Sequence, residues 1–270
     1  MNPLSSSQID QLRQLLPTLV ERESMIKHTS FHMGGEARMY IVATTSEMLL
    51  EAVRAAQHVG VPWYIFGGGS NLLVADQGFE GLMIQVANHQ LKIEGMSMYV
   101  ESGVVTALAA RKSVEAGLTG FEWASGVPGT IGGALFGNAG CFGGEMRDAV
   151  TRVDALRVAD GQRVALTNAE CQFGYRGSRF KQEQFVLLGC ELTLKTSDDP
   201  AASRARLDEI TKRRQEDQPQ GQSSAGCVFK NFEYTDEQAL DLLKRHVDEI
   251  PASMLAGHRI GAGWLVEQAD

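Results

Sequence analysis

The sequence lacks the features that mark several large classes of protein. Its 270 residues include only 4 cysteines, which form no Cys-x-x-Cys pair and have no metal-site spacing, so we expect reduced thiols and no bound metal. No apolar run approaches the length of a membrane span, and Met1–Gln8 has neither the basic start nor the apolar middle of a signal peptide. These absences predict a cytoplasmic protein that does not bind a membrane.

Positive charge is also scarce. The chain has 25 Lys+Arg against 33 Asp+Glu, a formal net charge of −8, which argues against nonspecific binding to nucleic acid. A local cationic pocket for a phosphorylated ligand remains compatible with this balance. Neither Gly-x-Gly-x-x-Gly nor Gly-Lys-Ser/Thr occurs, so the sequence has no Rossmann fingerprint and no Walker loop.

Glycine, in contrast, is abundant and clustered. Of 29 glycines, nine lie between residues 120 and 144, and five more are at positions 34, 35, 67, 68 and 69. With 43% hydrophobic and 21% charged residues the chain is globular, so these clusters are not a sign of disorder. They indicate tight turns, or backbone that a ligand approaches closely.

The first cluster follows a predicted strand at 61–66 and reads Gly67-Gly68-Gly69-Ser70-Asn71. Three consecutive glycines allow successive backbone N–H groups to point at one anion, as in a nest that binds a pyrophosphate. Ser70 and Asn71 add side-chain donors. The alternative is a plain flexible turn, because triple glycine also occurs in ordinary loops.

The second cluster runs from residue 124 to 145. Pro128-Gly129 predicts a turn, and Thr130 is placed to open a helix whose N-terminus faces an anion. Three glycines leave one face of that helix almost without side chains, so that a flat aromatic ligand could approach the backbone; they are Gly132, Gly133 and Gly137. The alternative is close packing between helices.

The pattern of apolar residues predicts an alternation of strands and helices. Ser7 with Asp10 predicts the start of a short helix that ends near Pro17, and a polar run predicts a domain boundary near residue 197. The other predicted helices are at 45–59, 106–116, 202–215 and 235–247, and the predicted strands are at 38–43, 61–66, 82–86, 91–94, 98–101, 150–158, 163–166 and 185–195.

Five motifs, in order along nearly the whole chain, resemble those of the UDP-N-acetylenolpyruvoylglucosamine reductases. These are flavoenzymes of peptidoglycan precursor and cell-wall synthesis, with an FAD-binding fold of the vanillyl-alcohol-oxidase (PCMH) type. The glycine clusters alone indicate only that type of flavoprotein, and the last two motifs make the resemblance specific. The motifs are His28–Ala37, Phe66–Leu73, Gly126–Ala134 with Asn138–Gly140, Phe173–Ser178, and Ser224–Asn231.

The resemblance implies an α+β protein with a two-subdomain PCMH-type FAD-binding fold and a partial α/β substrate-binding domain. We assign the subdomains to residues 1–80 and 81–197, and the substrate-binding domain to 198–270. The implied reaction reduces UDP-N-acetylglucosamine enolpyruvate to UDP-N-acetylmuramate, with FAD as cofactor and NADPH as co-substrate. We expect a monomer.

The resemblance also implies the binding residues. Those that would contact FAD are Gly67, Gly68, Gly69, Ser70, Asn71, Leu72, Ser125, Gly126, Pro128, Gly129, Thr130, Ile131, Gly133 and Asn138. Those that would contact the UDP-sugar are Tyr175, Arg213, Arg214, Lys230 and Asn231. Lys230 and Asn231 suit a diphosphate, as a point charge and a hydrogen-bonding amide. For Arg213 and Arg214 the solvated face of a charged helix is an equal alternative, and for Lys212 it is preferred.

Two residues match the catalytic positions of the family. Hydride addition leaves a carbanion conjugated to a carboxylate, which a fixed cation should stabilise, and Arg176 is the matching residue. Cys227 stands where the family usually has serine, and its thiol would protonate the carbon next to the new C–H bond. The alternatives are a surface arginine and a small buried cysteine.

Two departures from the family pattern stand out. Phe232 replaces a proline, and residues 233–256 look like an insertion. The chain also stops before the family's His-Ala-Asn-Phe motif and a glutamate that assists protonation, so we expect a shortened product or a fragment. Glu267 does not match that glutamate. The alternatives are therefore a flavin- or nucleotide-binding protein without full turnover, and a related flavin oxidoreductase acting on another substrate.

Overall fold

The computed structural model describes residues 3–217, 221–234, 236–247 and 249–269. Its Cα positions divide into two compact units, one up to Ala225 and one from Gly226 to Asp270. Each unit has buried apolar residues of its own. Among the described residues, no helix combines the length and apolar character that a bilayer crossing requires.

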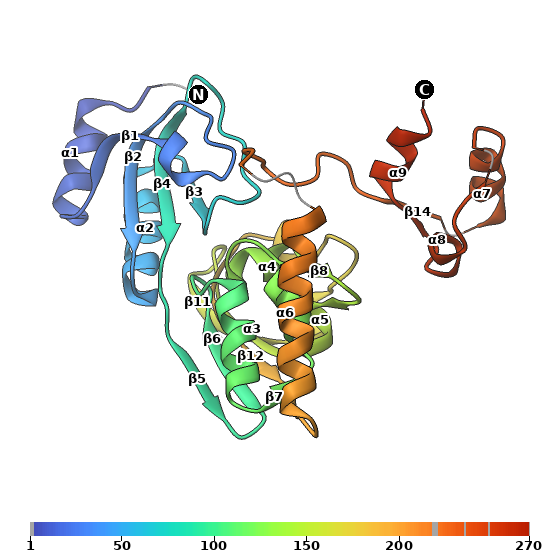
Figure 1. Ribbon diagram of the computed structural model, residues 1–270. Coiled ribbons are helices and arrows are strands. Elements are labelled where there is room, and N and C mark those ends of the chain that lie inside the picture. The colour runs from blue at the N-terminus through green and yellow to red at the C-terminus, as the bar shows by residue number, and fades with distance from the viewer. Residues whose placement is uncertain (1–2, 218–220, 235, 248, 270) are drawn as a thin grey trace. The chain divides into compact units, whose positions relative to one another are not determined.

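The first unit begins with a four-stranded sheet in the order β1-β2-β4-β3 (Figure 1). β2 and β3 each pair with β4 in parallel, and β1 pairs with β2 antiparallel. Helices α1 and α2 pack on this sheet through apolar residues spaced three and four apart. The bounds are β1 Val20–Ser24, β2 Glu36–Ala43, β3 Trp63–Phe66, β4 Phe79–Val86, α1 Ser6–Leu15 and α2 Ser46–Val59.

A five-stranded antiparallel sheet follows, in the order β11-β10-β12-β6-β5. The hairpin between β10 and β11 turns at Gly161, which has a φ of 70°. The strand bounds are β5 Leu91–Glu94, β6 Ser97–Glu101, β10 Val150–Arg157, β11 Gln162–Thr167 and β12 Phe185–Thr193. The two-stranded pairs of this unit are β7 Leu118–Thr119 with β13 Lys195–Thr196, and β8 Gly140–Cys141 with β9 Gly144–Glu145.

Helices cover the second sheet, and Figure 1 shows α6 alongside α3. The helix bounds are α3 Thr106–Glu115, α4 Ile131–Gly137, α5 Met146–Ala149 and α6 Pro200–Asp217, and the 3-10 segments of the unit are at 25–28, 122–126, 169–171 and 179–181. Leu156, Val186 and Leu188 from the second sheet are buried in the same apolar cluster as α1 and α2. The two sheets of this unit are therefore joined by a common core.

The second unit is small, and its core consists of Tyr234, Ile250 and Ile260 with partly buried neighbours. Its elements are β14 Phe232–Glu233, α7 Glu237–Lys244, α8 Ala252–Ala256, β15 Arg259–Ile260 and α9 Ala262–Glu267. The amide of Ala262, which begins α9, donates to Asn231 Oδ1 (3.1 Å). Asn231 thereby anchors the start of the helix.

The sheets and helices confirm the α+β fold class. Helix 45–59 is confirmed in detail: Thr45 Oγ1 accepts from the Met48 amide, and Gly60 ends the helix in the left-handed region. Two details were wrong. The first helix is capped by Ser5 with Gln8 and not by Ser7 with Asp10, because the Ser5 side chain accepts from the Gln8 amide.

The last predicted helix also differs from the structure. α7 ends at Lys244 and not near Val247. At its start Asp236 Oδ1 accepts from the Ala239 amide. Thr235, the first residue of the predicted helix, lies outside the described residues. The first compact unit continues past residue 197 and includes α6, so that position is no break in the packing. The assignment of three functional domains stays a prediction.

Candidate functional site

The triple-glycine loop directly follows β3 and lies between two other segments of the first unit. The Ser30 amide donates to Gly69 O (3.1 Å), and Gln85 Nε2 donates to Gly67 O (3.4 Å). Within the described part of the chain, the amides of Gly68 and Gly69 have no protein acceptor. This arrangement leaves consecutive N–H groups available to an anion, as a nest requires.

The three glycines of this loop do different work. A Cβ on Gly67 would overlap Thr130 Oγ1, and one on Gly69, whose φ is 63°, would overlap the carbonyl oxygen of His28. Both positions therefore need glycine for close packing of the loop. A Cβ on Gly68 would meet nothing closer than Gly129 Cα at 3.4 Å. Gly68 is thus the member of the trio that leaves space for something else.

A polar hollow of about 310 Å³ lies beside this loop. Its lining residues are Lys27, His28, Thr29, Ser30, His32, Gly68 and Gln85. Tyr40 joins two of them: its hydroxyl contacts His28 Nδ1 (3.3 Å) and donates to Gln85 Oε1. Burial, followed by the charge of Glu23, raises the pKa of Tyr40 to about 12, so the hydroxyl stays protonated at neutral pH.

The second glycine cluster forms the turn and helix expected for it. Gly129 has a φ of 98°, and Thr130 precedes α4 in an extended conformation. A Cβ on Gly132 would lie 2.8 Å from Ser102 Cβ, so this glycine serves close packing. Gly133 is exposed, and a Cβ there would meet nothing nearer than 3.9 Å. The bare face of α4 therefore reduces to Gly133 and Gly137.

The remaining predicted cofactor residues divide by exposure. Ile131 is fully buried, and Leu72 is partly buried and packs against an apolar cluster. Asn71 and Pro128 are exposed, and Ser125 Oγ donates to Glu122 O (2.8 Å). Ser70 Oγ lies 2.6 Å from a Cβ built on Gly129, which brings the two glycine clusters side by side.

Arg176 lies at the tip of a two-residue turn. The Gly174 and Gly177 amides donate to each other's carbonyl oxygens at 3.0 and 3.1 Å, and Arg176 has a φ of 50°. Arg176 Nη1 donates to Gly140 O (3.2 Å), and its guanidinium lies 5.6 Å from the Tyr175 ring centroid. The side chain is exposed on one side and held against the β8–β9 hairpin on the other.

Two arginines from α6 contact this hairpin and the 3-10 segment at 122–126 beside it. Arg214 Nη1 donates to Gly126 O (2.5 Å), and the Arg213 guanidinium lies 5.7 Å from the Phe142 ring centroid. A Cβ on Gly126 would meet both Phe142 and Cys141 Sγ. The structure therefore brings Arg176 into one region with Arg213 and Arg214, which are far from it in sequence. Lys212 instead pairs with Glu216 (3.7 Å) and is exposed.

The charges of Arg176 and Arg214 affect the pKa of Cys141. Its Sγ donates to Trp123 O (3.2 Å). Burial raises the pKa of the Cys141 thiol, and the positive charges of Arg214 and Arg176 oppose part of that rise. The positive charges of both arginines therefore act at the position of Cys141.

The other predicted residues belong to the second unit. Cys227 and Lys230 are exposed, and Val228 and Phe229 between them are 91% and 67% exposed. Asn231 is also exposed, with Oδ1 used by the Ala262 amide. Ser224, at the start of the same motif, lies in the first unit and its amide donates to Ser30 O (3.3 Å).

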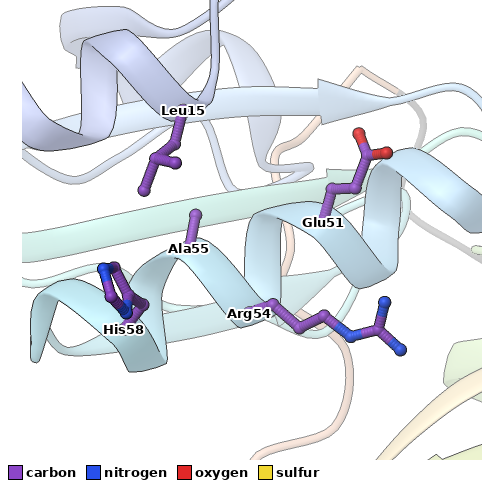
Figure 2. A pocket seen from close by; sticks show the side chains of 5 residues that line it. All are labelled: Leu15, Glu51, Arg54, Ala55 and His58. Atoms are coloured by element: carbon purple, nitrogen blue, oxygen red, sulfur yellow. The ribbon is translucent and has the colours of Figure 1, made fainter.

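A further hollow of about 260 Å³ lies where the end of α1 meets α2, and Figure 2 shows the five side chains that line it. They are Leu15, Glu51, Arg54, Ala55 and His58. None of them was predicted from the sequence to be functional. This hollow brings together no group from the glycine loops or the arginine cluster.

Sequence reasoning missed several residues of the site. Gln85 and Tyr40 support the first glycine loop. Phe142 contacts the Arg213 guanidinium, and the neighbouring Cys141 is affected by the charges of Arg214 and Arg176. Phe142 has a φ of 49° and Gly143 one of 87°, which gives the β8–β9 hairpin a tight turn. The sequence signal for that turn is Phe142-Gly143-Gly144, which lies inside the second glycine cluster.

Known proteins resemble this chain in sequence. Residues 37–167 match a family described as an FAD binding domain. A UDP-N-acetylenolpyruvoylglucosamine reductase from Caldicellulosiruptor bescii is 38% identical over 204 residues, which are 75% of this chain and 65% of that protein. One from Caldanaerobacter subterraneus is 33% identical over 225 residues, 82% of this chain and 74% of that protein. The chain thus spans less than two thirds of the first relative.

Solved structures resemble it as well. The UDP-N-acetylenolpyruvylglucosamine reductase (MurB) of Thermus caldophilus matches with a TM-score of 0.66 at 29% identity, over 86% of this chain and 80% of that one. Phl p 4.0202, a glucose dehydrogenase, matches with a TM-score of 0.56 at 12% identity, over 71% and 44%. The second match shows a shared fold alone.

Proposed function

We propose that this chain, which belongs to the family of UDP-N-acetylenolpyruvoylglucosamine reductases, reduces UDP-N-acetylglucosamine enolpyruvate to UDP-N-acetylmuramate with FAD and NADPH. The observation that carries the proposal is that Arg176 and Arg213 contact the β8–β9 hairpin and that Arg214 bonds to Gly126, which lies against the same hairpin. In a chain of net charge −8, such a cluster suits a substrate that bears a carboxylate and a diphosphate.

The glycine loops fit the cofactor. The amides of Gly68 and Gly69 are available to a pyrophosphate, and the bare surface at Gly133 and Gly137 accommodates a flat ring system. We infer that these residues, with Ser70, Gly129 and Thr130, would hold FAD. When bound, FAD supplies the hydride that NADPH provides and the enolpyruvyl group accepts.

We assign the rest of the reaction to side chains of this chain. Hydride addition to the terminal carbon places negative charge on the adjacent carbon and its carboxylate, which the Arg176 guanidinium stabilises. The Cys227 thiol then donates its proton to that carbon, so one hydride and one proton are added across the double bond. Arg213, Arg214, Lys230 and Asn231 bind the anionic nucleotide-sugar, with Tyr175 beside Arg176.

Oxidation of NADPH by the flavin-loaded protein tests this proposal. We expect the enolpyruvyl nucleotide-sugar to stimulate NADPH oxidation and to yield UDP-N-acetylmuramate. Cys227→Ala should retain flavin reduction by NADPH and lose product formation by about 10²-fold or more, since it removes a general acid. Cys171→Ala, which removes a thiol from the core, is the control for loss of a cysteine.

Each contrary result has a distinct meaning. A protein that takes up no FAD contradicts the whole proposal. Bound flavin without sugar-dependent turnover would support a flavin-binding protein instead, and turnover with another acceptor would support a different oxidoreductase. If Cys227→Ala loses flavin reduction as well, the cysteine is not the acid.

A further inference from the structure

The Asn138 side chain is 1% exposed and connects three segments of the first unit. It ends α4 in the left-handed region, with a φ of 42°. Its Nδ2 donates to Glu145 Oε2 (2.7 Å) and to Gly174 O (3.0 Å), while its Oδ1 accepts from the Arg147 amide (3.0 Å). Both of its amide protons and one acceptor position are thus used inside the protein.

Gly174 is one end of the turn that carries Tyr175 and Arg176. The turn is closed by the two hydrogen bonds between Gly174 and Gly177, and the φ of 50° at Arg176 is a conformation that L residues rarely adopt. Such a turn needs outside support to stay in one conformation. The Asn138 amide supplies it at Gly174.

The second partner of Asn138 belongs to the hairpin that Arg176 contacts. Glu145 pairs with Gly140 in the β8–β9 hairpin, and Gly140 O accepts from Arg176 Nη1. One buried amide is therefore bonded both to the turn from which Arg176 projects and to the hairpin that receives its guanidinium. No other side chain among the described residues has hydrogen bonds to both Glu145 and Gly174.

We propose that Asn138 is a positioning residue, which orients Arg176 by bonding Gly174 and Glu145 at once. This inference rests on the proposed function and assigns Asn138 a different role from the FAD contact expected from its motif. Both Nδ2 protons of Asn138 are used by Glu145 and Gly174, so the side chain has no donor left for FAD. We therefore expect Asn138 to affect turnover through Arg176. Its removal should therefore lower kcat while the affinity for FAD and the KM for NADPH stay the same.

Asn138→Gly is the direct test, because glycine keeps the left-handed backbone and deletes only the amide. We expect kcat to fall about tenfold, the effect of one lost productive interaction, with the FAD Kd and the NADPH KM changed less than about threefold. Gln172→Gly is the matched control: Gln172 also has a positive φ (48°) at the end of a short helix, and it is exposed.

A double-mutant comparison separates positioning from a general structural effect. In an Arg176→Ala background, Asn138→Gly should reduce kcat no further, because the residue through which it acts is gone. An equal fall in kcat on Asn138→Gly in the wild-type and Arg176→Ala backgrounds would overturn the proposal. So would a large rise in the FAD Kd with normal kcat in the flavin-saturated enzyme, which would indicate a cofactor contact.

Amide hydrogen exchange provides a readout that needs no activity. Asn138→Gly should increase exchange in the Gly174–Gly177 segment and leave the β10–β11 hairpin unchanged. Asn138→Asp loses both donors when ionised and also places a carboxylate beside Glu145, so it should increase exchange in the same segment at least as much. If both variants unfold, or neither alters exchange in the turn, the proposal is wrong. An inactive wild-type enzyme with the predicted exchange pattern would contradict only the proposed function.

Discussion

At the scale of single residues, the four cysteines show how one side chain takes its chemistry from its surroundings. Cys171 and Cys190 are fully buried in the core of the second sheet, and burial raises the pKa of both thiols, that of Cys171 to about 11. Cys141 is half-buried beside two arginines, whereas Cys227 is exposed. Reactivity follows the exposed thiolate, so the four should react very differently.

We therefore predict that an aromatic disulfide reagent labels Cys227 first in the native protein. Cys141 should follow more slowly, and because its pKa is raised its rate should continue to increase to higher pH than that of an ordinary thiol. Cys171 and Cys190 should react only after unfolding. Cys227→Ser should remove the fast phase alone, and peptide mapping of the labelled protein checks the order. Rapid labelling of Cys171 would contradict the burial that the structure shows.

At the scale of elements, α4 is a seven-residue helix that contains three of the 29 glycines. Glycine in a helix interior costs about 0.5–1 kcal/mol relative to alanine, so each needs a reason to be there. Gly132 has one within the fold, since a Cβ there would press on Ser102. At Gly133 no contact within the protein requires a glycine, so we infer that the missing side chain leaves room for a ligand.

The matched pair Gly133→Ala and Gly132→Ala tests this difference. Without FAD, Gly133→Ala should raise the free energy of unfolding by roughly 0.5–1 kcal/mol, because alanine is the better helix former. Gly132→Ala should lower it. If α4 faces the cofactor, Gly133→Ala should also weaken FAD binding, as measured by flavin fluorescence titration. A Gly133→Ala protein that is stabilised and binds FAD normally would show that this face is not part of the cofactor site.

At the scale of the whole molecule, the first unit encloses several acids in their neutral form. Tyr40 and Cys171 have pKa values of about 12 and about 11, and that of Cys190 is also raised. Burial is the first cause in each case. A group whose pKa is higher in the folded than in the unfolded state stabilises the folded protein at every pH below its unfolded-state pKa. That stabilisation is lost as the pH rises from the unfolded-state pKa to the folded-state pKa.

We accordingly predict that the free energy of unfolding falls as the pH rises above about 9, where a free thiol begins to ionise in the unfolded chain. Cys171 should account for about 1–2 kcal/mol of the fall between about pH 9 and pH 11. In Cys171→Ala the fall should be shallower by that amount, and in Cys227→Ala, which changes an exposed thiol, it should match the wild type. Urea unfolding at a series of pH values measures both slopes.

Local signals predicted most of the longer helices and strands, although β1 was not predicted. The helix at 46–59 follows from a cap at Thr45, the spacing of its apolar residues and Gly60, all of which act within a few residues. The first helix was misplaced because Ser5 and Ser7 offer competing caps of similar quality, and only the bond to Gln8 decides between them. The boundary near 197 marks a real change in composition, but α6 is charged on its surface and still packs through Ile210 and Leu207.

The sequence by itself determined the family, the α+β class and the glycine loops, because motifs and turn residues are properties of adjacent positions. Only the tertiary structure decided which glycines serve packing and which leave space, since a Cβ at Gly69 meets His28 and one at Gly133 meets nothing close. It also decided that Arg176 and Arg213 contact one hairpin while Arg214 bonds to the neighbouring Gly126, and that Asn138 bonds to Gly174. Such contacts join segments that are far apart along the chain, and no local pattern of residues records which distant backbone a side chain will meet.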